Sequence, residues 1–308
     1  MASGTPLQRE VFARNQFSGR FFGTMNLSEP HAGSSLATIL TRAVPDGPNH
    51  ETDPLGPRHR LSGRKMWISA GAHDMAENIV HLVLAKIPGP DGQLIAGTSS
   101  IALFIVPQHL VDVNGSLTGE RNDIALAGLN HKLGYRATTN TLLNYGEGRY
   151  RVRAPGGTDG RGAGAIGYLV GKPGEGLRCM FQMMNEARIQ VGLGAAMLGF
   201  AGYLSSLAYA RERIQGQSIT ERGSGRKDAA RPPVPIIDHP DVKRMRLAQK
   251  SYSEGALALE LYCAWLVDES QVGEPEAVAR TNRLLEVLAP IAKSWPSEWC
   301  LEGNSLAI

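Results

Sequence analysis

The stretch Phe22-Gly-Thr-Met-Asn-Leu-Ser-Glu-Pro-His-Ala-Gly-Ser-Ser35 begins as a short extended run and opens into a loop of small residues. Pro30 disfavours helix at the glutamate before it, and Gly33 permits a tight turn. Further along, Lys65-Met-Trp-Ile-Ser69 offers an aromatic ring and a hydroxyl on a second extended run. Hydroxyls, loop N–H groups and a stacking surface suit a flat polar ring system with a phosphate tail. On the pattern alone, a β-turn beside a core tryptophan is the simpler interpretation.

The first half of the chain has a residue pattern that is typical of a β domain. Short runs rich in Ile, Val, Thr and Leu alternate with Gly, Pro, Asp and Asn, and helical spacing is absent. This pattern predicts a β-barrel or sandwich. We expect its strands at 21–27, 36–44, 65–69, 78–85, 99–106 and 138–145.

From Gly176 onward the apolar residues recur at three- and four-residue steps, which is typical of helices. One helix is predicted to run through Gln215, a second from about 238 to 268, and a third from Glu274. Pro290 and Pro296 are expected to interrupt or restart the third. The predicted fold class is α+β, with a middle β-barrel or sandwich domain followed by an incomplete C-terminal helical bundle.

Composition bounds the function without choosing one. The 308 residues are 42% apolar and 20% charged, as in ordinary soluble globular proteins. No run of about 18 apolar residues and no secretory leader is visible, so no membrane span is expected. The three cysteines are far apart and read as buried thiols in a reducing compartment, which favours a cytoplasmic protein. A net charge of +3 is too small to indicate nucleic acid, and no residue set has metal-ligand spacing.

The two opening segments resemble the flavin-contacting motifs of the acyl-CoA dehydrogenase family. Further motifs match in order, and several resemble the branch that contains the 3-methylmercaptopropionyl-CoA dehydrogenases. The matching segments are Asn78–Lys86, Ile101–Pro107, Glu120–Asp123, His131–Arg136, Gly167–Gly171, Met183–Ile189 and Ala208–Arg213. The resemblance covers roughly residues 20 to 308 and implies an acyl-CoA dehydrogenase truncated at both ends.

The resemblance also implies a domain plan. Residues 1–20 are expected to be a remnant of the N-terminal helical domain or disordered. Residues 21–150 correspond to the middle β domain, and 151–165 to a flexible Gly- and Arg-rich loop. Residues 166–308 correspond to a truncated C-terminal helical domain.

FAD is the cofactor that the resemblance implies. Leu27, Ser28, Ser34, Trp67 and Ser69 match positions that contact flavin, although Ser35 stands where relatives often carry Asp. Arg213 matches a residue that reaches the flavin pyrophosphate of a neighbouring subunit, and Gln215 is a helper beside it. A solvated charge near a helix C-terminus is the alternative for Arg213.

Substrate contacts are implied in the helical half. Arg188 lies on an apolar stripe and matches an arginine that helps to bind the CoA part of the substrate; Asn185 stands nearby, where many relatives have Asp. The alternative is an arginine whose stem packs while its head reaches water. The implied reaction is α,β-dehydrogenation of an acyl-CoA, with 3-methylmercaptopropionyl-CoA or another short acyl-CoA as the substrate, by a homodimer or homotetramer. Electron-transfer flavoprotein is the implied acceptor.

The catalytic base of this branch is a glutamate expected beyond Ile308. Glu302 is out of place for that role, and Ala187 occupies the position that holds the base in other branches. No catalytic residue is therefore assigned within the chain. Glu29 is interpreted as a brace for its loop, and His31 and His131 as histidines without partners.

Two alternatives to the enzyme remain open. One is a non-catalytic fragment that binds flavin or acyl-CoA, because the binding motifs are present and the base is not. The other is a DNA-associated flavoprotein of the alkylation-response type, based on Arg222, Arg226, Lys227, Arg231 and the arginine-rich stretch 149–161. A solvated loop explains these charges more simply, so no nucleic-acid partner is expected.

Overall fold

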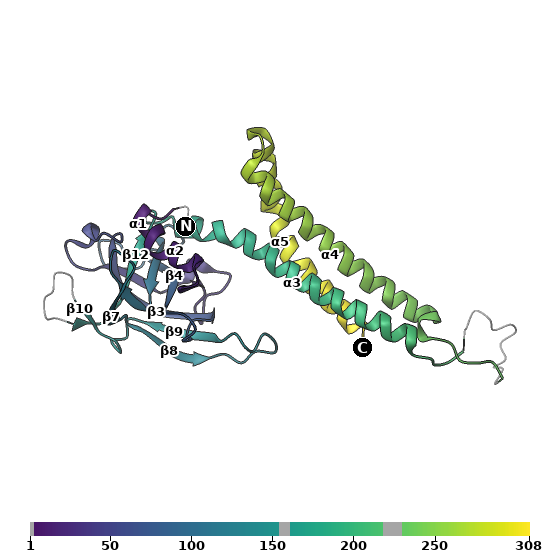
Figure 1. The fold of residues 1–308 in the computed structure, drawn as a ribbon. Helices are drawn as coiled ribbons and strands as arrows, with labels where there is room; N and C mark the ends of the chain where they lie inside the picture. Colours follow the sequence, from purple (N-terminus) through teal and green to yellow (C-terminus); the bar gives the residue numbers. More distant parts are fainter. Residues whose placement is uncertain (1–2, 154–160, 218–229) are drawn as a thin grey trace. The chain divides into compact units, whose positions relative to one another are not determined.

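The computed structural model describes residues 3–153, 161–217 and 230–308. The chain divides into two compact units, Met1–Phe181 and Gln182–Ile308. The first contains the strands and the second the long helices (Figure 1). Helix α3, Gly176–Glu212, begins in the first unit and continues into the second.

The first unit is built on an eight-stranded sheet that closes on itself. Seven strands follow the order β1-β4-β5-β12-β3-β9-β8. The remaining strand, β2, pairs with both β3 and β4, so the path through β4, β5, β12, β3 and β2 returns to its start. Of the two architectures that the sequence predicts, a barrel or a sandwich, the structure has the barrel. The bounds are β1 Phe21–Asn26, β2 Arg42–Pro45, β3 Arg58–Ser69, β4 Asn78–Lys86, β5 Ile101–Pro107, β8 Ile124–Leu129, β9 Asn140–Tyr145 and β12 Ala165–Val170.

Two short ribbons flank the barrel. β6, His109–Val111, pairs with β7, Leu117–Arg121, and β10, Val152–Arg153, pairs with β11, Arg161–Gly162. Every residue of β4 and β5 is buried, as their continuous apolar runs suggest. The core of the barrel gathers side chains such as Leu61, Val83, Phe104 and Tyr145.

The strand predictions hold except at one place. Residues 36–44 do not form one strand: a 3₁₀ turn, Leu36–Thr38, precedes the four residues of β2. The expected helical domain from residue 166 also differs from the structure, because β12 continues to Val170 and pairs with β3 and β5. Tyr168 lies opposite Arg58 and Ile105, inside the sheet.

Residues 3–20, before the barrel, form an ordered segment, in contrast to the disordered alternative expected for 1–20. Short helical turns cover Pro6–Phe17, beginning at a Thr5 capping box. Val11 and Phe12 are buried, and the Gln8 Nε2 donates to the carbonyls of Leu55 and Leu169 at 2.8 and 2.9 Å. These contacts attach the segment to the first unit.

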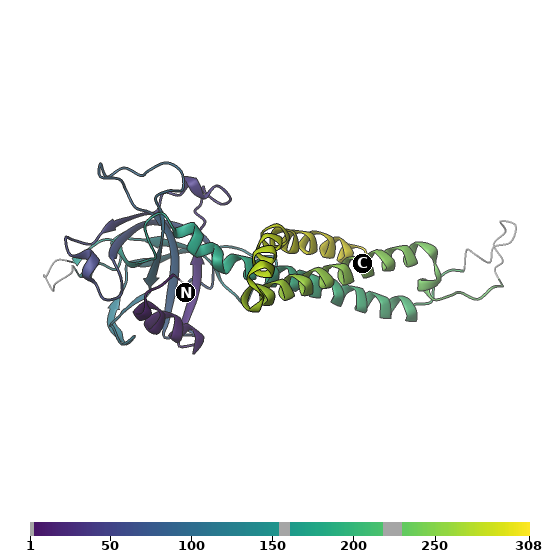
Figure 2. The ribbon, with the colours of Figure 1, turned by 90° about the horizontal axis from the view of Figure 1, so that it is seen from above.

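The second unit packs three long helices side by side (Figure 2). They are α3, already given, α4 Pro240–Val272 and α5 Pro275–Ser305. Glycines let α3 approach α5 closely: a Cβ at Gly199 would collide with Cys300, and one at Gly202 with Asn304. Ile189, Cys263 and Leu285 bury a common core from the three helices.

The predicted break in the third helix is wrong. α5 is continuous and contains both Pro290 and Pro296. Pro296 is buried, as are Ala292 and Cys300 one turn to either side. An interior proline costs about 3 kcal/mol in an isolated helix, but burial against neighbouring helices offsets that preference.

Among the residues that the structure describes, one helix, α3, is long and apolar enough by length and composition to cross a membrane. The sequence expectation missed it because glycines, alanines and serines interrupt its apolar residues. A core helix of a soluble protein passes the same test. Residues 154–160 of the predicted loop 151–165 lie outside the described residues, and the described remainder differs from a loop because it contains β10, β11 and the first residue of β12. The basic residues Arg222, Arg226 and Lys227 also lie outside the described residues.

Candidate functional site

Two backbone carbonyls of the loop after β1 accept hydrogen bonds from strand β3. The Met66 backbone N–H donates to the carbonyl oxygen of Ser28 at 3.0 Å, and Lys65 Nζ donates to that of Leu27 at 2.9 Å. The two segments quoted from the sequence are therefore neighbours in space. Leu27 and Ser28 lie beside the segment that carries Trp67, as the proposed ring site requires.

Glu29 fixes this junction. Its carboxylate is buried and accepts from Lys65 Nζ at 3.0 Å, from the Leu40 N–H at 2.8 Å, and from both the N–H and the Oγ1 of Thr41 at 3.0 and 2.6 Å. One side chain thus holds the loop, β3 and the start of β2 together. The interpretation of Glu29 as a brace is confirmed.

Lys65 and Glu29 form a fully buried ion pair. Burial alone would raise the pKa of Glu29, but Lys65 and the donors of Leu40 and Thr41 outweigh it, so the pKa is lowered. Burial lowers the pKa of Lys65 to about 8, against the opposing effect of Glu29. Both groups are charged at neutral pH, which makes each the necessary partner of the other.

Trp67 lies on a bulge of β3 in a conformation that residues other than glycine seldom adopt. The pairing of β3 with β9 shifts register between Lys65 and Ile68, and Trp67 has a φ of 66°. Its side chain is 60% exposed, so the alternative of a core tryptophan is wrong. A strained backbone that turns an indole outward is typical of a functional position, because such a conformation persists only where its surroundings impose it.

Ser34 and Ser69 are exposed on the same unit. Ser34 lies in the loop that begins with reciprocal hydrogen bonds between Glu29 and Ala32, and Ser69 ends β3 opposite Asn140. Their hydroxyls are available to a ligand, and with Trp67 they supply the donors and the stacking surface that a flavin needs. The residues present therefore fit FAD.

His31 was predicted to have no partner, and this prediction is wrong: its Nε2 lies 3.7 Å from Glu29 Oε2.

The four remaining predicted residues belong to the second unit and form two pairs. Arg188 donates to Asn185 Oδ1 at 3.2 Å on α3, where both side chains are half-buried. Arg213 donates to Gln215 Oε1 at 3.4 Å just after α3, and both are exposed. The pairs stand roughly 37 Å apart along the helix axis at 1.5 Å per residue, so the two pairs cannot contact the same group of one ligand.

The Arg213 pair is held in place by the chain that returns to it. The Ile236 N–H donates to the Arg213 carbonyl at 2.8 Å, and the Gln215 N–H donates to that of Val234 at 3.0 Å. His239 Nε2 lies 2.7 Å from the Gln215 carbonyl oxygen. These bonds give a defined conformation to a segment that the sequence left in doubt.

A buried polar network under β1 was missed from the sequence. Thr24 Oγ1 lies 2.7 Å from His81 Nδ1 and accepts from Asn26 Nδ2 at 2.7 Å, while Tyr145 OH donates to Asn26 Oδ1 at 3.1 Å. Burial lowers the pKa of His81 to about 3, so the ring is neutral. The signal in the sequence was the i, i+2 spacing of Thr24 and Asn26, which places both on one face of a strand. Within the described ranges, no group of three or more His, Cys, Asp or Glu could hold a metal ion.

Comparison with known proteins gives a consistent picture. No family model matches the chain. It is 35% identical over 307 residues to a 3-methylmercaptopropionyl-CoA dehydrogenase of Ruegeria pomeroyi, which covers 99% of the chain and 46% of the relative. A butyryl-CoA dehydrogenase of Syntrophomonas wolfei is 33% identical, over 97% of the chain and 45% of its own length. The chain thus spans about half the length of the curated relatives it matches.

The fold agrees with this likeness. The solved structure of butyryl-CoA dehydrogenase from Megasphaera elsdenii superposes with a TM-score of 0.66 over 99% of the chain and 62% of that structure, at 17% identity. At that identity the likeness concerns the fold alone. A barrel followed by long packed helices, together with relatives that align with almost the whole chain at 35 and 33% identity, leads to one conclusion: this chain belongs to the acyl-CoA dehydrogenase family.

Proposed function

We propose that the chain carries the FAD- and acyl-CoA-binding part of a flavoprotein that introduces an α,β double bond into an acyl-CoA thioester. The observation that carries the proposal is the exposed indole of Trp67, held outward by a strained bulge and tied through Met66 to Ser28. A tryptophan at such a place has a large apolar face open to a ligand. Family membership supports the flavin ring as that ligand.

Each residue has a proposed role. Leu27 and Ser28 border the ring beside Trp67, and Ser34 and Ser69 offer hydroxyls to the rest of the cofactor. FAD, when bound, supplies the acceptor for the hydride that leaves the β carbon of the substrate. The chain's own part is to bind and orient the ring and to shield one face of it from water.

The helical residues are proposed for the charged parts of the ligands. Arg188, oriented by Asn185, binds the CoA part of the substrate. Arg213 and Gln215 reach the flavin pyrophosphate of a neighbouring copy, which makes the protein a homodimer or homotetramer. We assign no catalytic base within the chain.

The finer assignments follow from the same branch of the family. The Ruegeria relative is named for 3-methylmercaptopropionyl-CoA, and we propose this or another short acyl-CoA as the substrate. Electron-transfer flavoprotein is proposed as the acceptor and the cytoplasm as the location.

Titration with FAD tests the proposal directly. We expect saturable binding by the purified chain, seen as quenching of flavin fluorescence. Anaerobic addition of butyryl-CoA or 3-methylmercaptopropionyl-CoA then separates catalysis from binding. Bleaching of the bound flavin supports the dehydrogenase, and a bound flavin that no acyl-CoA bleaches supports the non-catalytic alternative. A chain that binds no flavin contradicts both, and salt-sensitive DNA binding by such a chain would favour the alkylation-response type.

A further inference from the structure

An arginine-lined cavity lies at the opposite end of β3 from the candidate flavin site. Its volume is about 650 Å³, and its walls are formed by β7, by residues between 148 and 153 and by Arg161. Its charged lining consists of Arg121, Arg149, Arg151, Arg153, Arg161 and one acid, Glu120. None of these residues belongs to the candidate flavin and acyl-CoA sites, and the arginines of the stretch 149–161 entered only the DNA-binding alternative.

A buried carboxylate builds one wall of this cavity. Asp123 is 1% exposed and accepts three backbone N–H groups, from Gly148 at 2.7 Å, Tyr150 at 3.0 Å and Gly164 at 3.0 Å. These bonds fix the segment that carries Arg149 and Tyr150. The wall is therefore a defined surface and not a loop that happens to carry charge.

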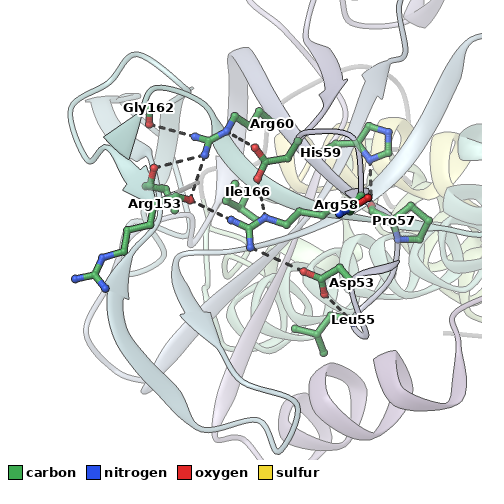
Figure 3. A network of polar contacts seen from close by, with 12 residues as sticks. Asp53, Leu55, Pro57, Arg58, His59, Arg60, Arg153, Gly162 and Ile166 are labelled. Carbon is green, nitrogen blue, oxygen red and sulfur yellow. Dashed lines mark hydrogen bonds and ion pairs between the residues drawn. The ribbon is translucent and has the colours of Figure 1, made fainter. Parts of the chain in front are cut away.

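Two arginines of β3 hold the second wall of the cavity, the segment that contains Arg153, in place. Arg58 and Arg60 donate to the Arg153 carbonyl at 3.3 and 3.2 Å, and their Nε atoms donate to Asp46 at 2.7 and 2.6 Å. Figure 3 shows both side chains reaching from β3 to Arg153, with Gly162 beside Arg60. Because Asp46 is already used by this pair, it does not neutralise the arginines of the cavity.

The positive charge in the cavity is not balanced. Glu120 Oε1 accepts from the Arg153 backbone N–H at 3.0 Å, and in residues 3–153, 161–217 and 230–308 no ion pair joins a carboxylate to any of the five arginines. The guanidinium of Arg121 lies 4.1 Å from the centre of the Tyr150 ring, and that of Arg149 lies 5.7 Å from it. Stacking on a ring orients a guanidinium and leaves its N–H edge for an acceptor.

We propose that this cavity binds a small molecule that carries two or more phosphate charges. Guanidinium groups form bidentate bonds to phosphate oxygens, and several of them around one cavity favour a multiply charged anion. The volume falls in the range of small-molecule sites. Trp67 is seven residues beyond Arg60 on β3, about 23 Å at 3.3 Å per residue, so the site is separate from the candidate flavin site.

Calorimetric titration of the full chain with sodium pyrophosphate, in the presence of saturating FAD, tests this site. We expect one saturable event with a submillimolar Kd that weakens as salt is raised from about 50 to 200 mM. The double variant Arg121→Gln, Arg161→Gln should weaken binding at least tenfold. Both side chains are exposed, so folding should survive, and circular dichroism checks it.

A charge-matched control separates the site from general positive charge. Arg14→Gln, Arg136→Gln removes two exposed arginines elsewhere in the first unit and should leave pyrophosphate affinity within about twofold. Equal loss in both double variants, or no saturable binding, overturns the proposal. So does tighter binding of a poly-glutamate peptide or of single-stranded oligodeoxythymidine than of pyrophosphate, because these would identify the cavity as a macromolecular contact.

Discussion

At the scale of single residues, Glu29 shows how one buried charge organises a binding loop. Its carboxylate accepts four hydrogen bonds, from Lys65, from Leu40 and two from Thr41. Neutralising it leaves a buried ammonium without its counter-charge, and breaking such a pair destabilises by about 3–5 kcal/mol. The loop that carries Ser28 and Ser34 depends on this one acid.

We therefore expect Glu29→Gln to destabilise the first unit by about 3–5 kcal/mol, measured by urea denaturation. Glu51→Gln, an exposed acid of the same unit, should change the free energy of unfolding by less than about 0.5 kcal/mol. The pKa of Glu29 is lowered in the folded state, so its contribution is present above its ordinary pKa of 4.5 and is lost as the pH falls through the lowered value. A Gln variant as stable as the parent would disprove the brace.

Substitutions of Trp67 can separate the effect of backbone strain on stability from the effect of the indole on ligand binding. Glycine adopts a positive φ without strain, so Trp67→Gly removes the indole while relaxing the bulge. We expect the variant to fold with unchanged or slightly greater stability, and to bind FAD about tenfold more weakly because the stacking surface is lost. Trp67→Phe, which keeps an aromatic face, should recover most of the affinity. Undiminished flavin affinity in Trp67→Gly would exclude the indole from the site.

Some features of these residues could be predicted from the sequence and others could not. The turn at Glu29-Pro30 and the position of Trp67 followed from proline chemistry and from the family resemblance. The outward orientation of the indole did not follow, because it results from a register shift against β9, a strand distant in sequence. The part played by Lys65 was missed for the same reason: a buried ion pair depends on which strands become neighbours.

At the scale of elements, α5 shows that a proline inside a helix leaves a backbone carbonyl free to accept a hydrogen bond from a neighbouring helix. Pro296 has no N–H, so the Ala292 carbonyl oxygen lacks its i+4 donor. A Cβ at Gly192 of α3 would collide with this oxygen and with Glu260 Oε1 of α4, so both oxygens lie against the same point of α3. Glu260 is 1% exposed, and in the part of the chain that the structure describes neither of its carboxylate oxygens has a hydrogen-bond partner. A protonated Glu260 can donate to the carbonyl that Pro296 releases.

The stability of the helical unit should therefore fall as the pH rises. Burial raises the pKa of Glu260 to about 7 from 4.5, so the folded state holds a proton that the unfolded state has lost between these values. Stability decreases from about pH 4.5 to 7 and stays lower above, by at most about 3 kcal/mol. Thermal unfolding of the second unit at pH 5 and pH 8 measures the difference.

Glu260→Gln should remove this dependence, because an amide donates to Ala292 at every pH. The variant is expected to match the parent near pH 5 and to exceed its stability at pH 8. Glu298→Gln, an exposed acid on α5, serves as the control and should keep the parent's profile. A parent profile that is flat between pH 5 and 8 would rule out a proton on Glu260.

Helix positions were predictable, but helix continuity was not. The three- and four-residue spacing gave α3 and α4 to within a few residues. The break at Pro290 and Pro296 was predicted from the low intrinsic helix propensity of proline. The helix is continuous because Ala292, Pro296 and Cys300 are buried against the neighbouring helices. Whether the free Ala292 carbonyl finds another donor depends on Gly192 and Glu260, which lie on two other helices, so the sequence of α5 alone could not show it.

At the scale of the whole molecule, the chain contains two units with separate cores. The barrel core and the helical cores share no residue. Hydrogen exchange can therefore report on each unit in one experiment. We expect Glu29→Gln to speed exchange in β3 and β4 and to leave α4 and α5 unchanged, while Glu260→Gln slows exchange in α4 and α5 at pH 8 alone. In the double variant the two effects should add within about 0.5 kcal/mol, and faster exchange of α5 in Glu29→Gln would contradict the separation.

The β character of the first half was predictable from alternation and turn residues, but the closed sheet was not. Closure depends on β2, four residues that pair with β3 and, through Arg42 and Lys86, with β4. The segment that contains β2 was read as a longer strand, because the sequence does not show the hydrogen bonds that Glu29 makes to Leu40 and Thr41. Long-range pairing of this kind is set by the whole fold.

The exposed indole of the first unit has a practical consequence for optical work. The chain has four tryptophans, and the other three, Trp265, Trp295 and Trp299, all lie in α4 and α5. Replacing those three by phenylalanine leaves one emitter, at the bulge beside Ser28. Its emission maximum and lifetime would then follow events at that spot without a dye, whichever molecule arrives there.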